Sequence, residues 1–337
     1  MIAAVVERPG KVGIERVDDP TPGPREVLVE VAACGICGTD LHILEGESPL
    51  ARYPIVPGHE FCGEVVAVGQ GVEDLRLGDF VAVDPNLPCG HCRMCQVGRD
   101  NLCLNYEAIG VTRAGACAEL VTAPAANAFV LPPDLPRSWG TLVEPLSCAV
   151  HGFDRLAARL ADRYLIYGAG TMGLLMAQLA QRAGAAAVDV VDVQERRLPV
   201  AEQLGADRAA TSADELDRPQ GWEVVIDATG AVRAIEDGLR RVARGGTFLM
   251  FGVTPAEAIA EFSPFRVYNE EVSVIGSMAV LHSFERARDL LVAGAIDAEA
   301  MITHSMALES YEAAVAAFRS GAGLKIQVTP ATDGQGR

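Results

Sequence analysis

Four cysteines within a 15-residue stretch are the densest group of metal-binding side chains in the sequence. Cys89, Cys92, Cys95 and Cys103 are separated by two, two and seven residues. Four thiolates complete a tetrahedral shell around Zn²⁺ and leave no open position, which is typical of a structural zinc site. An odd total of nine cysteines, four of them in this stretch, favours metal binding in a reducing compartment over disulfides. His91, inside the stretch, is interpreted as a bystander.

A second, mixed set of metal-binding residues is dispersed along the chain. Cys37 lies within the segment 34–42, His59 and Glu60 stand side by side, and Glu144 follows much later. Sulfur, imidazole and carboxylate together make the shell of a catalytic zinc, whose remaining position takes water or substrate. Taken singly, each residue has an ordinary structural interpretation. Cys37 can be a small core residue, His59 a turn residue and Glu144 a surface acid. Only the whole set predicts a catalytic metal site.

A glycine-rich turn between a predicted strand and a predicted helix indicates a dinucleotide site. Gly168 permits the tight turn, Gly170 lets the backbone approach a pyrophosphate, and Gly173 lets helix and sheet pack closely. The phosphates then meet free N–H groups at a helix N-terminus. Asp192 comes 22 residues after Gly170, at the end of the next predicted strand, where a carboxylate binds the adenosine ribose hydroxyls.

The same carboxylate favours NAD over NADP, because it repels the 2′-phosphate of NADP. Arg196 and Arg197 are near enough to pair with such a phosphate, or else they flank the adenine or lie in solvent. NAD is the expected cofactor and NADP the alternative. The predicted contacts here are Gly168, Gly170, Thr171, Met172, Gly173, Asp192, Val193 and Arg197.

The surrounding patterns predict one β-rich region and one region of alternating strands and helices. Residues 1–90 contain short apolar runs bounded by Gly and Pro, typical of strands. Residues 139–160 have helical spacing. From Tyr164 to Ser277, strands alternate with helices, which indicates a parallel sheet covered by helices. Two further helices and a last strand, Lys325–Val328, complete the prediction.

Composition excludes several classes of function. A net charge of −17 argues against nucleic acid and against anionic membrane surfaces, which both reward a basic face. The apolar runs fall well short of the roughly 18 residues of a membrane span, and we expect a cytoplasmic protein. We expect neither nucleic acid nor a membrane as a partner, and we expect further copies of the chain, as a dimer or tetramer.

Together these features resemble the zinc-containing medium-chain dehydrogenase/reductase family over essentially the whole chain. The resemblance rests on the segment Cys37–His42, on His59 with its two neighbours, on the four-cysteine stretch, on Gly168–Gly173 and on Asp192. It implies an α/β protein with a GroES-like β-rich catalytic domain and a Rossmann domain with a doubly wound parallel sheet. The expected bounds are 1–140 with 281–337 for the catalytic domain and 141–280 for the Rossmann domain.

The resemblance also implies roles for individual residues. Two zinc ions per subunit are expected, one structural and one catalytic, with Cys37 and His59 as the first catalytic ligands and Glu60 and Glu144 as alternatives for the next position. Thr39 takes the alcohol proton, the nicotinamide ribose passes it on, and His42 delivers it to water. Asp40 orients a ligand. Further expected cofactor contacts are Thr229, Val253, Ser277 and, at the pyrophosphate, Lys325.

Within the family, Glu144-Pro145-Leu146 is similar to the polyol and sorbitol dehydrogenase branch. We therefore expect an NAD-dependent enzyme that oxidises a secondary alcohol, a polyol or sugar alcohol, to the ketone. Ile43, where sorbitol dehydrogenases of animals carry tyrosine, argues against sorbitol itself. The alternatives are an L-threonine 3-dehydrogenase, which the segment Thr39–His42 resembles, a general alcohol dehydrogenase, a reductase of this fold without catalytic zinc, and a non-catalytic zinc protein.

Overall fold

The computed structural model describes residues 1–330, which form two compact units. The first unit consists of residues 1–147, 280–293 and 298 onward, and the second consists of residues 148–279 and 294–297. The predicted catalytic domain also includes residues 331–337, which lie outside the described residues. Within the described residues, no helix has the length and apolar character needed to cross a bilayer.

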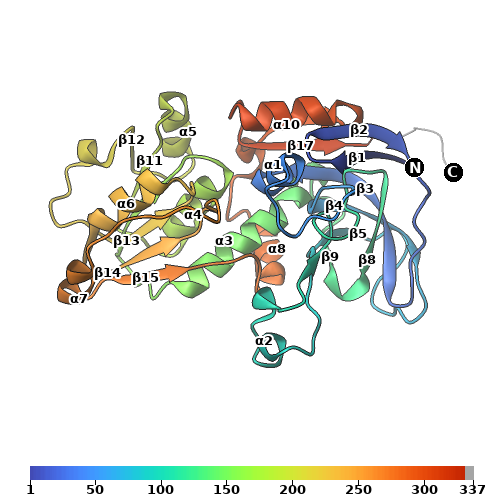
Figure 1. The fold of residues 1–337 in the computed structure, drawn as a ribbon, viewed down its shortest axis with the longest axis horizontal. Coiled ribbons are helices and arrows are strands. Elements are labelled where there is room, and N and C mark those ends of the chain that lie inside the picture. The colour runs from blue at the N-terminus through green and yellow to red at the C-terminus, as the bar shows by residue number, and fades with distance from the viewer. Residues whose placement is uncertain (331–337) are drawn as a thin grey trace. The chain divides into compact units, whose positions relative to one another are not determined.

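A seven-stranded sheet forms the centre of the first unit (Figure 1). Its strand order is β16-β17-β3-β4-β5-β9, with β8 also pairing β3. The strands are β3 (Glu26–Ile36), β4 (Glu60–Val68), β5 (Phe80–Val83), β8 (Leu120–Pro124), β9 (Ala128–Val130), β16 (Ile302–Ala307) and β17 (Lys325–Thr329). β17 pairs antiparallel with β3, so the end of the described chain joins the strand that leads to Cys37. The predicted last strand therefore belongs to the sheet of the first unit.

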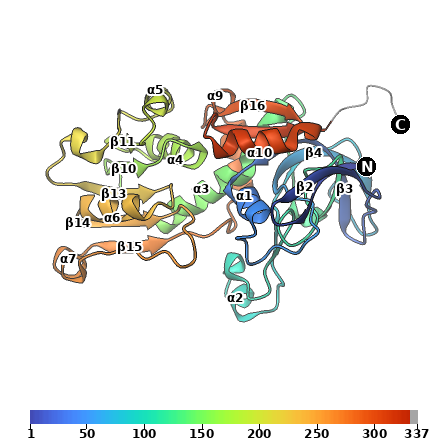
Figure 2. The ribbon, with the colours of Figure 1, turned by 45° about the horizontal axis from the view of Figure 1, so that its top comes forward.

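Two small ladders and five helices complete this unit. β1 (Ile2–Arg8) and β2 (Lys11–Arg16) form a hairpin, and β6 (Asn86–Leu87) pairs with β7 (Glu107–Ala108) at the base of the cysteine-rich stretch. The helices are α1 (Gly38–Glu45), α2 (Arg93–Gln96), α8 (Phe284–Val292), α9 (Ala298–Met301) and α10 (Tyr311–Arg319). Figure 2 shows α10 beside β16, and α10 contacts both β16 and β17.

Helix α1 was not expected, because residues 1–90 are predicted as β only. Cys37 caps this helix: its Sγ accepts from the N–H of Thr39, at 3.3 Å, and its own N–H donates to the carboxylate of Asp40, at 2.9 Å. This reciprocal capping satisfies two backbone N–H groups that a helix start leaves unpaired. A cysteine is an unusual cap, so the composition of the segment did not indicate a helix.

The second unit contains a six-stranded parallel sheet of order β12-β11-β10-β13-β14-β15. This is the 3-2-1-4-5-6 order of dinucleotide-binding Rossmann sheets. The strands are β10 (Arg163–Tyr167), β11 (Ala187–Val191), β12 (Arg208–Ala210), β13 (Trp222–Asp227), β14 (Val242–Met250) and β15 (Ser273–Gly276). The helices that connect them are α4 (Thr171–Arg182), α5 (Leu198–Gln203), α6 (Val232–Arg241) and α7 (Pro264–Glu270). Helix α3 (Val143–Arg155) starts in the first unit and ends in the second.

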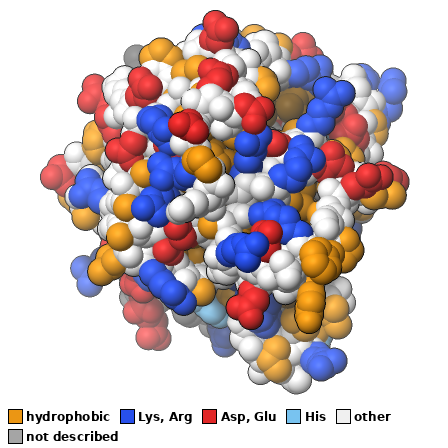
Figure 3. Space-filling model, turned by 90° about the vertical axis from the view of Figure 1, so that its left-hand side faces the viewer, with side chains coloured by type: hydrophobic (Ala, Val, Ile, Leu, Met, Phe, Trp, Pro, Cys, Tyr) orange, Lys and Arg blue, Asp and Glu red, His pale blue; other side chains and the backbone are white. Residues whose placement is uncertain are grey.

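The central strands of this sheet are almost entirely buried. Leu165 and Ile166 in β10 and Val225 and Ile226 in β13 have no solvent exposure. Parallel strands covered on both faces read as unbroken apolar runs, which is how the sequence indicated them. The α/β fold class, with one β-rich unit and one Rossmann sheet, is confirmed. On the face that Figure 3 shows, acidic and basic side chains alternate, without a large area of one sign.

Candidate active site and zinc sites

Three of the four predicted catalytic ligands come together at the end of β3 and the start of β4. Cys37 directly follows β3, His59 precedes β4, and Glu60 is the first residue of β4. The Sγ of Cys37 lies 3.1 Å from Nε2 of His59, and the ligand atoms of all three residues lie within 4.8 Å of one another. Glu144, in the first turn of α3, is not part of this group.

Burial and charge set the protonation of these groups. Burial raises the pKa of the Cys37 thiol, and attraction to His59 offsets only part of that rise. Burial alone lowers the pKa of His59, but the attraction of Cys37, Asp40 and Glu144 raises it well above its ordinary value. A divalent cation bound between them supplies the positive charge that stabilises a buried thiolate and lets a neutral imidazole act as ligand. The donor set therefore fits Zn²⁺.

Lys325 and Glu60 form a buried ion pair beside these ligands. The ammonium group of Lys325, which is 2% exposed, donates to the carboxylate of Glu60. Burial lowers the pKa of Lys325, and the attraction of Glu60, Cys37 and Glu144 outweighs it, so the net shift is upward. The predicted pyrophosphate contact of Lys325 remains a prediction, whereas its contact with Glu60 was not anticipated. The two residues are 265 positions apart, and no local pattern could have indicated the pair.

Asp40 is buried behind the mixed ligand set. Its Oδ2 accepts from the N–H of Cys37, and its Oδ1 lies 4.0 Å from Nδ1 of His59. Neither of these last two atoms has a hydrogen-bond partner among the described residues. Burial raises the pKa of Asp40. The carboxylate thus faces the ring nitrogen opposite the ligating Nε2, which is the arrangement that orients a metal-binding histidine.

Thr39 and His42 occupy the first and last turns of α1. Thr39 is half-buried next to Cys37 and donates its backbone N–H to the sulfur. The side chain of His42 is 38% exposed, and its Nδ1 lies 2.9 Å from a carboxylate oxygen of Glu47. The first turn of the helix therefore holds a threonine whose backbone contacts the sulfur of Cys37, and its last turn holds a partly exposed imidazole. Their function in a relay stays a prediction.

The four cysteines of residues 89–103 form a separate cluster, with all four sulfurs within 4.8 Å of one another. Sγ of Cys92 lies 3.5 Å from Sγ of Cys95 and 3.9 Å from Sγ of Cys103. A Zn–S bond of about 2.3 Å with tetrahedral angles requires sulfurs about 3.8 Å apart, so these positions fit Zn²⁺. His91 is not in the cluster; its Nδ1 lies 2.7 Å from the carbonyl oxygen of Cys89.

Backbone N–H groups surround this cluster. N–H groups of Cys89, Cys92, Leu104 and Asn105 each donate to a cysteine sulfur, at 3.3–3.5 Å. The N–H of His91 is the main reason that the pKa of Cys89 falls to about 6. The pKa of Cys95 rises to about 12 because it is desolvated and lies among other sulfurs. The fold alone therefore stabilises the thiolate of Cys89 and disfavours the thiolate of Cys95.

The predicted dinucleotide turn lies between β10 and α4 in the second unit. A Cβ atom at Gly173 would lie only 1.7 Å from the carbonyl oxygen of Gly168, so helix and turn need a glycine to approach this closely. Asp192 directly follows β11, and its Oδ2 accepts from the N–H of Ala169 at 2.7 Å. Arg197 pairs with the same carboxylate at 3.4 Å. The acid and the turn that the sequence assigned to one cofactor therefore lie in contact.

The remaining predicted cofactor residues of this unit follow strand ends. Thr229 comes after β13 and donates its hydroxyl to Asp227, and Val253, after β14, is exposed. Ser277 follows β15, and its buried Oγ has no hydrogen-bond partner among the described residues. A buried hydroxyl left unpaired in the protein is what a bound ligand would satisfy. These positions fit a nicotinamide cofactor, which binds beyond the carboxyl ends of such strands.

Comparison with known families gives two matches. Residues 23–133 match the alcohol dehydrogenase GroES-like domain, and residues 171–293 match the zinc-binding dehydrogenase family. D-arabinitol dehydrogenase 1 of Uromyces fabae is 38% identical and covers 98% of this chain and 97% of its own length. The chain belongs to the zinc-containing medium-chain alcohol dehydrogenase family. It is a zinc-dependent NAD(P) dehydrogenase that acts on an alcohol.

Other relatives of this dehydrogenase differ in substrate. An L-threonine 3-dehydrogenase of Thermococcus kodakarensis is 36% identical over 93% of both chains. A D-altritol 5-dehydrogenase of Agrobacterium fabrum is 34% identical over 85% of this chain and 86% of its own. Because this chain is about equally identical to relatives with different substrates, the comparison supports an alcohol or polyol dehydrogenase and does not select one substrate.

Two solved structures of relatives contain a nicotinamide cofactor. A zinc-binding dehydrogenase of Sinorhizobium meliloti 1021, bound to NADP, has a TM-score of 0.94 and 36% identity over 98% of this chain and 99% of its own. An alcohol dehydrogenase of E. coli CFT073, complexed with NADH, has a TM-score of 0.91 and 30% identity over the same shares. The nicotinamide cofactor of the family is thus confirmed, and the phosphate on its ribose varies between relatives.

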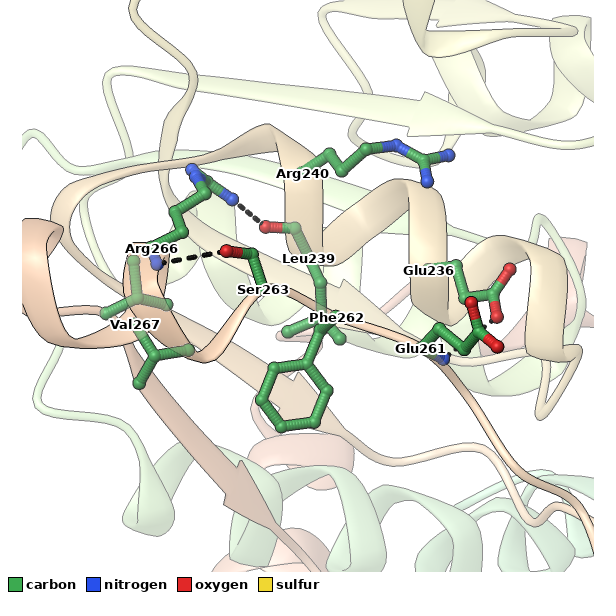
Figure 4. A pocket seen from close by; sticks show the side chains of 9 residues that line it. Glu236, Leu239, Arg240, Glu261, Phe262, Ser263, Arg266 and Val267 are labelled. Atoms are coloured by element: carbon green, nitrogen blue, oxygen red, sulfur yellow. Dashed lines mark hydrogen bonds between the residues drawn. The ribbon is translucent and has the colours of Figure 1, made fainter.

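A pocket between α6 and α7 contains none of the predicted site residues (Figure 4). Arg266 lies on one side of it and donates to the carbonyl oxygens of Leu239 and Val242. Leu239 lies in the last turn of α6 and Val242 directly follows the helix, where backbone carbonyls have no partner within the helix. The pocket is therefore lined in part by a side chain that caps α6, and it is separate from the residues of the mixed ligand set.

Proposed function

We propose that this dehydrogenase oxidises a secondary hydroxyl of a neutral polyol or sugar alcohol to the ketone and uses NAD as hydride acceptor. The carrying observation is the charge of the mixed ligand set. Cys37, Asp40, Glu60 and Glu144 all act on its electrostatics, and Lys325 is the cation that acts with them. When these groups are ionised, the four acidic side chains outweigh the single ammonium group and the two positive charges of one zinc ion, so the formal charge of the site stays negative. A neutral substrate is therefore favoured over a phosphate or carboxylate anion.

Each group has a defined part in this chemistry. When bound at Cys37 and His59, zinc acts as a Lewis acid that makes a coordinated hydroxyl more acidic. The Thr39 hydroxyl accepts the proton of the substrate, and His42 delivers a proton to solvent. Glu144 carries a carboxylate that accepts hydrogen bonds from neighbouring hydroxyls of a polyol. Hydride transfer itself is the chemistry of the nicotinamide.

L-threonine is the second candidate, supported by a relative of 36% identity. Its carboxylate needs a cation, and the ammonium group of Lys325 is already paired with Glu60. A polyol carries no charge that must be paired, and its hydroxyl groups can donate hydrogen bonds to an acceptor such as the carboxylate of Glu144. The names of the two polyol dehydrogenases among the relatives agree with this preference.

A substrate panel tests the proposal. The zinc-loaded enzyme is assayed with D-arabinitol, D-altritol, galactitol 1-phosphate, L-threonine and 2-propanol, each with NAD and with NADP. We expect the highest kcat/KM with a neutral polyol and NAD. Highest activity with threonine or with the phosphate ester overturns the substrate class, and turnover of 2-propanol alone reduces the function to a general alcohol dehydrogenase.

Asp192→Ala tests the cofactor. The carboxylate accepts from the N–H of Ala169 and opposes a 2′-phosphate, so its removal weakens NAD binding and narrows the preference over NADP. A lost charged hydrogen bond corresponds to roughly 1.5–3 kcal/mol, or about ten- to more than a hundredfold in affinity. Fluorescence titration of both cofactors measures it, with Asp207→Ala on the same unit as control. An unchanged ratio of the two dissociation constants contradicts NAD selection by Asp192.

A homo-oligomer is part of the proposal. β15 is an edge strand of the six-stranded sheet, and Phe265 and Tyr268 on the neighbouring α7 are 70% and 82% exposed. An open strand edge beside exposed aromatic side chains supports association with another copy. Light scattering with Phe265→Asp, which is expected to shift the enzyme toward monomers, tests it; a monomeric parent overturns it.

A further inference from the structure

The end of helix α1 is built so that the chain turns back toward His42. Gly46 has a φ of 78°, a left-handed conformation that a glycine adopts without strain. The N–H groups of the next two residues, Glu47 and Ser48, both donate to the carbonyl oxygen of His42, at 2.8 and 3.1 Å. The backbone of Glu47 is therefore fixed next to the backbone of His42.

This turn brings a carboxylate to the imidazole ring. Oε2 of Glu47 lies 2.9 Å from Nδ1 of His42, while the side chains are 60% and 38% exposed. An exposed pair of this kind contributes only about 0–1 kcal/mol to stability. Its effect on the ring is more specific, because a carboxylate can only accept a hydrogen bond, and Nδ1 must then carry the proton.

We propose that Glu47 is a positioning residue that holds His42 in the Nδ1–H tautomer and so keeps Nε2 free to accept a proton. The proposal rests on the proposed function, in which His42 delivers the alcohol proton to solvent. His42 starts neutral with its proton on Nδ1 and gains a second proton on Nε2. The resulting imidazolium is stabilised by Glu47, and the Nε2 proton then passes to water, which restores the starting state.

Glu45 provides a matched control on the same helix end. Its carboxylate pairs with Arg319 of α10 and not with His42. Glu45→Ala therefore removes one negative charge and one exposed ion pair, as Glu47→Ala does, and leaves the imidazole contact in place. Differences between the two variants report on His42 and not on the net charge.

The first experiment measures the tautomer directly. Ring ¹⁵N chemical shifts of the holoenzyme are recorded at alkaline pH, because a neutral imidazole shows which ring nitrogen carries the proton, and His42→Ala assigns the signals. We expect Nδ1–H in the parent and in Glu45→Ala, and a shift toward Nε2–H in Glu47→Ala. Nε2–H in the parent, or an unchanged tautomer in Glu47→Ala, overturns the proposal. This result does not depend on turnover, so it remains decisive if the proposed substrate class fails.

The second experiment measures proton transfer. We expect Glu47→Ala to lower kcat about tenfold with little change in KM, as a fraction of the roughly 10²–10⁴-fold that a positioned acid–base group supplies. Glu47→Gln, which retains an acceptor, is expected to keep most of kcat. Added imidazole should restore turnover in both Glu47→Ala and His42→Ala. Parental kcat in Glu47→Ala or His42→Ala overturns the proposal, and so does a decrease in kcat that added imidazole does not restore.

Discussion

The two candidate zinc sites of this dehydrogenase are assembled in opposite ways. The four-cysteine site comes from one continuous segment, 89–103, whose ends are joined by the short β6–β7 ladder. The mixed site takes Cys37 from the end of β3 and His59 and Glu60 from the start of β4. The four-cysteine site is a loop whose ends are joined locally. The mixed site lies at the ends of strands in a sheet whose pairing does not depend on the metal ligands.

The charges around the two sites differ as well. In the cysteine segment, backbone N–H groups donate to the sulfurs, and these donors exist only while the loop keeps its shape. In the mixed site, Lys325 from β17 is a permanent counter-charge for Glu60. We infer that the cysteine loop depends on zinc for its fold, whereas the mixed site keeps its geometry and depends on zinc for its chemistry.

Cys37→Ser is expected to have the largest effect on turnover. Loss of this ligand removes a Lewis acid that contributes several kcal/mol to transition-state stabilisation, so kcat/KM should fall by about 10³-fold or more. Metal analysis should find one zinc per chain in place of two, with a melting temperature close to that of the parent. A variant that retains both zinc ions and parental activity contradicts the assignment of Cys37.

Cys95→Ser is expected to destabilise the fold of residues 89–103 more than it lowers turnover. Structural zinc contributes an apparent 10–16 kcal/mol or so in small zinc-dependent folds, and an incomplete shell forfeits a large part of it. We expect one zinc per chain and rapid proteolysis within residues 89–103. The control is Cys148→Ser, which lies outside both ligand clusters and should retain two zinc ions. Equal protease resistance in the two variants contradicts a structural role for the segment.

Lys325→Met tests the counter-charge. Removing one partner of a buried ion pair costs about 3–5 kcal/mol, because the other charge stays buried and unpaired. A bound zinc ion can balance part of the charge of Glu60 in place of Lys325. The decrease in melting temperature caused by Lys325→Met should therefore be larger in chelator-treated protein than in zinc-loaded protein. Lys11→Met, at an exposed pair with Glu7, is the control. An equal loss with and without zinc contradicts the inference.

The sequence predicted what is encoded locally. The spacing of the four cysteines predicted that they cluster, and a strand followed by Gly168–Gly173 and Asp192 predicted that the acid lies at the glycine-rich turn, because each set lies within one or two neighbouring elements. The unbroken apolar runs of β10 and β13 likewise identified a parallel sheet. In each case a short-range pattern was sufficient, since the interacting atoms belong to adjacent parts of the chain.

Contacts between distant elements could not be predicted in this way. Lys325 was assigned to the pyrophosphate, and its contact with Glu60 depends on the pairing of β17 with β3. Helix α1 was missed because its start depends on a cysteine cap that has no propensity of its own. The sequence also left Glu60 and Glu144 as equal candidates for the metal, and three-dimensional proximity groups Glu60 with Cys37 and His59.

Glu144→Gln should have the smallest effect and the most informative one. Glu144 lies outside the group of clustered ligand atoms, yet its charge raises the pKa of both His59 and Lys325. If it accepts hydrogen bonds from substrate hydroxyls, the neutral amide should lower kcat/KM for polyols by about tenfold and for 2-propanol much less, since one charged hydrogen bond corresponds to roughly 1.5–3 kcal/mol. The competing interpretation is an acid in the first turn of α3 that interacts with the helix dipole at roughly 0.3–1 kcal/mol. Under that interpretation, the glutamine variant melts slightly lower and keeps parental kinetics with every alcohol. The ratio of kcat/KM for polyol to that for 2-propanol, measured in parent and variant, separates the two.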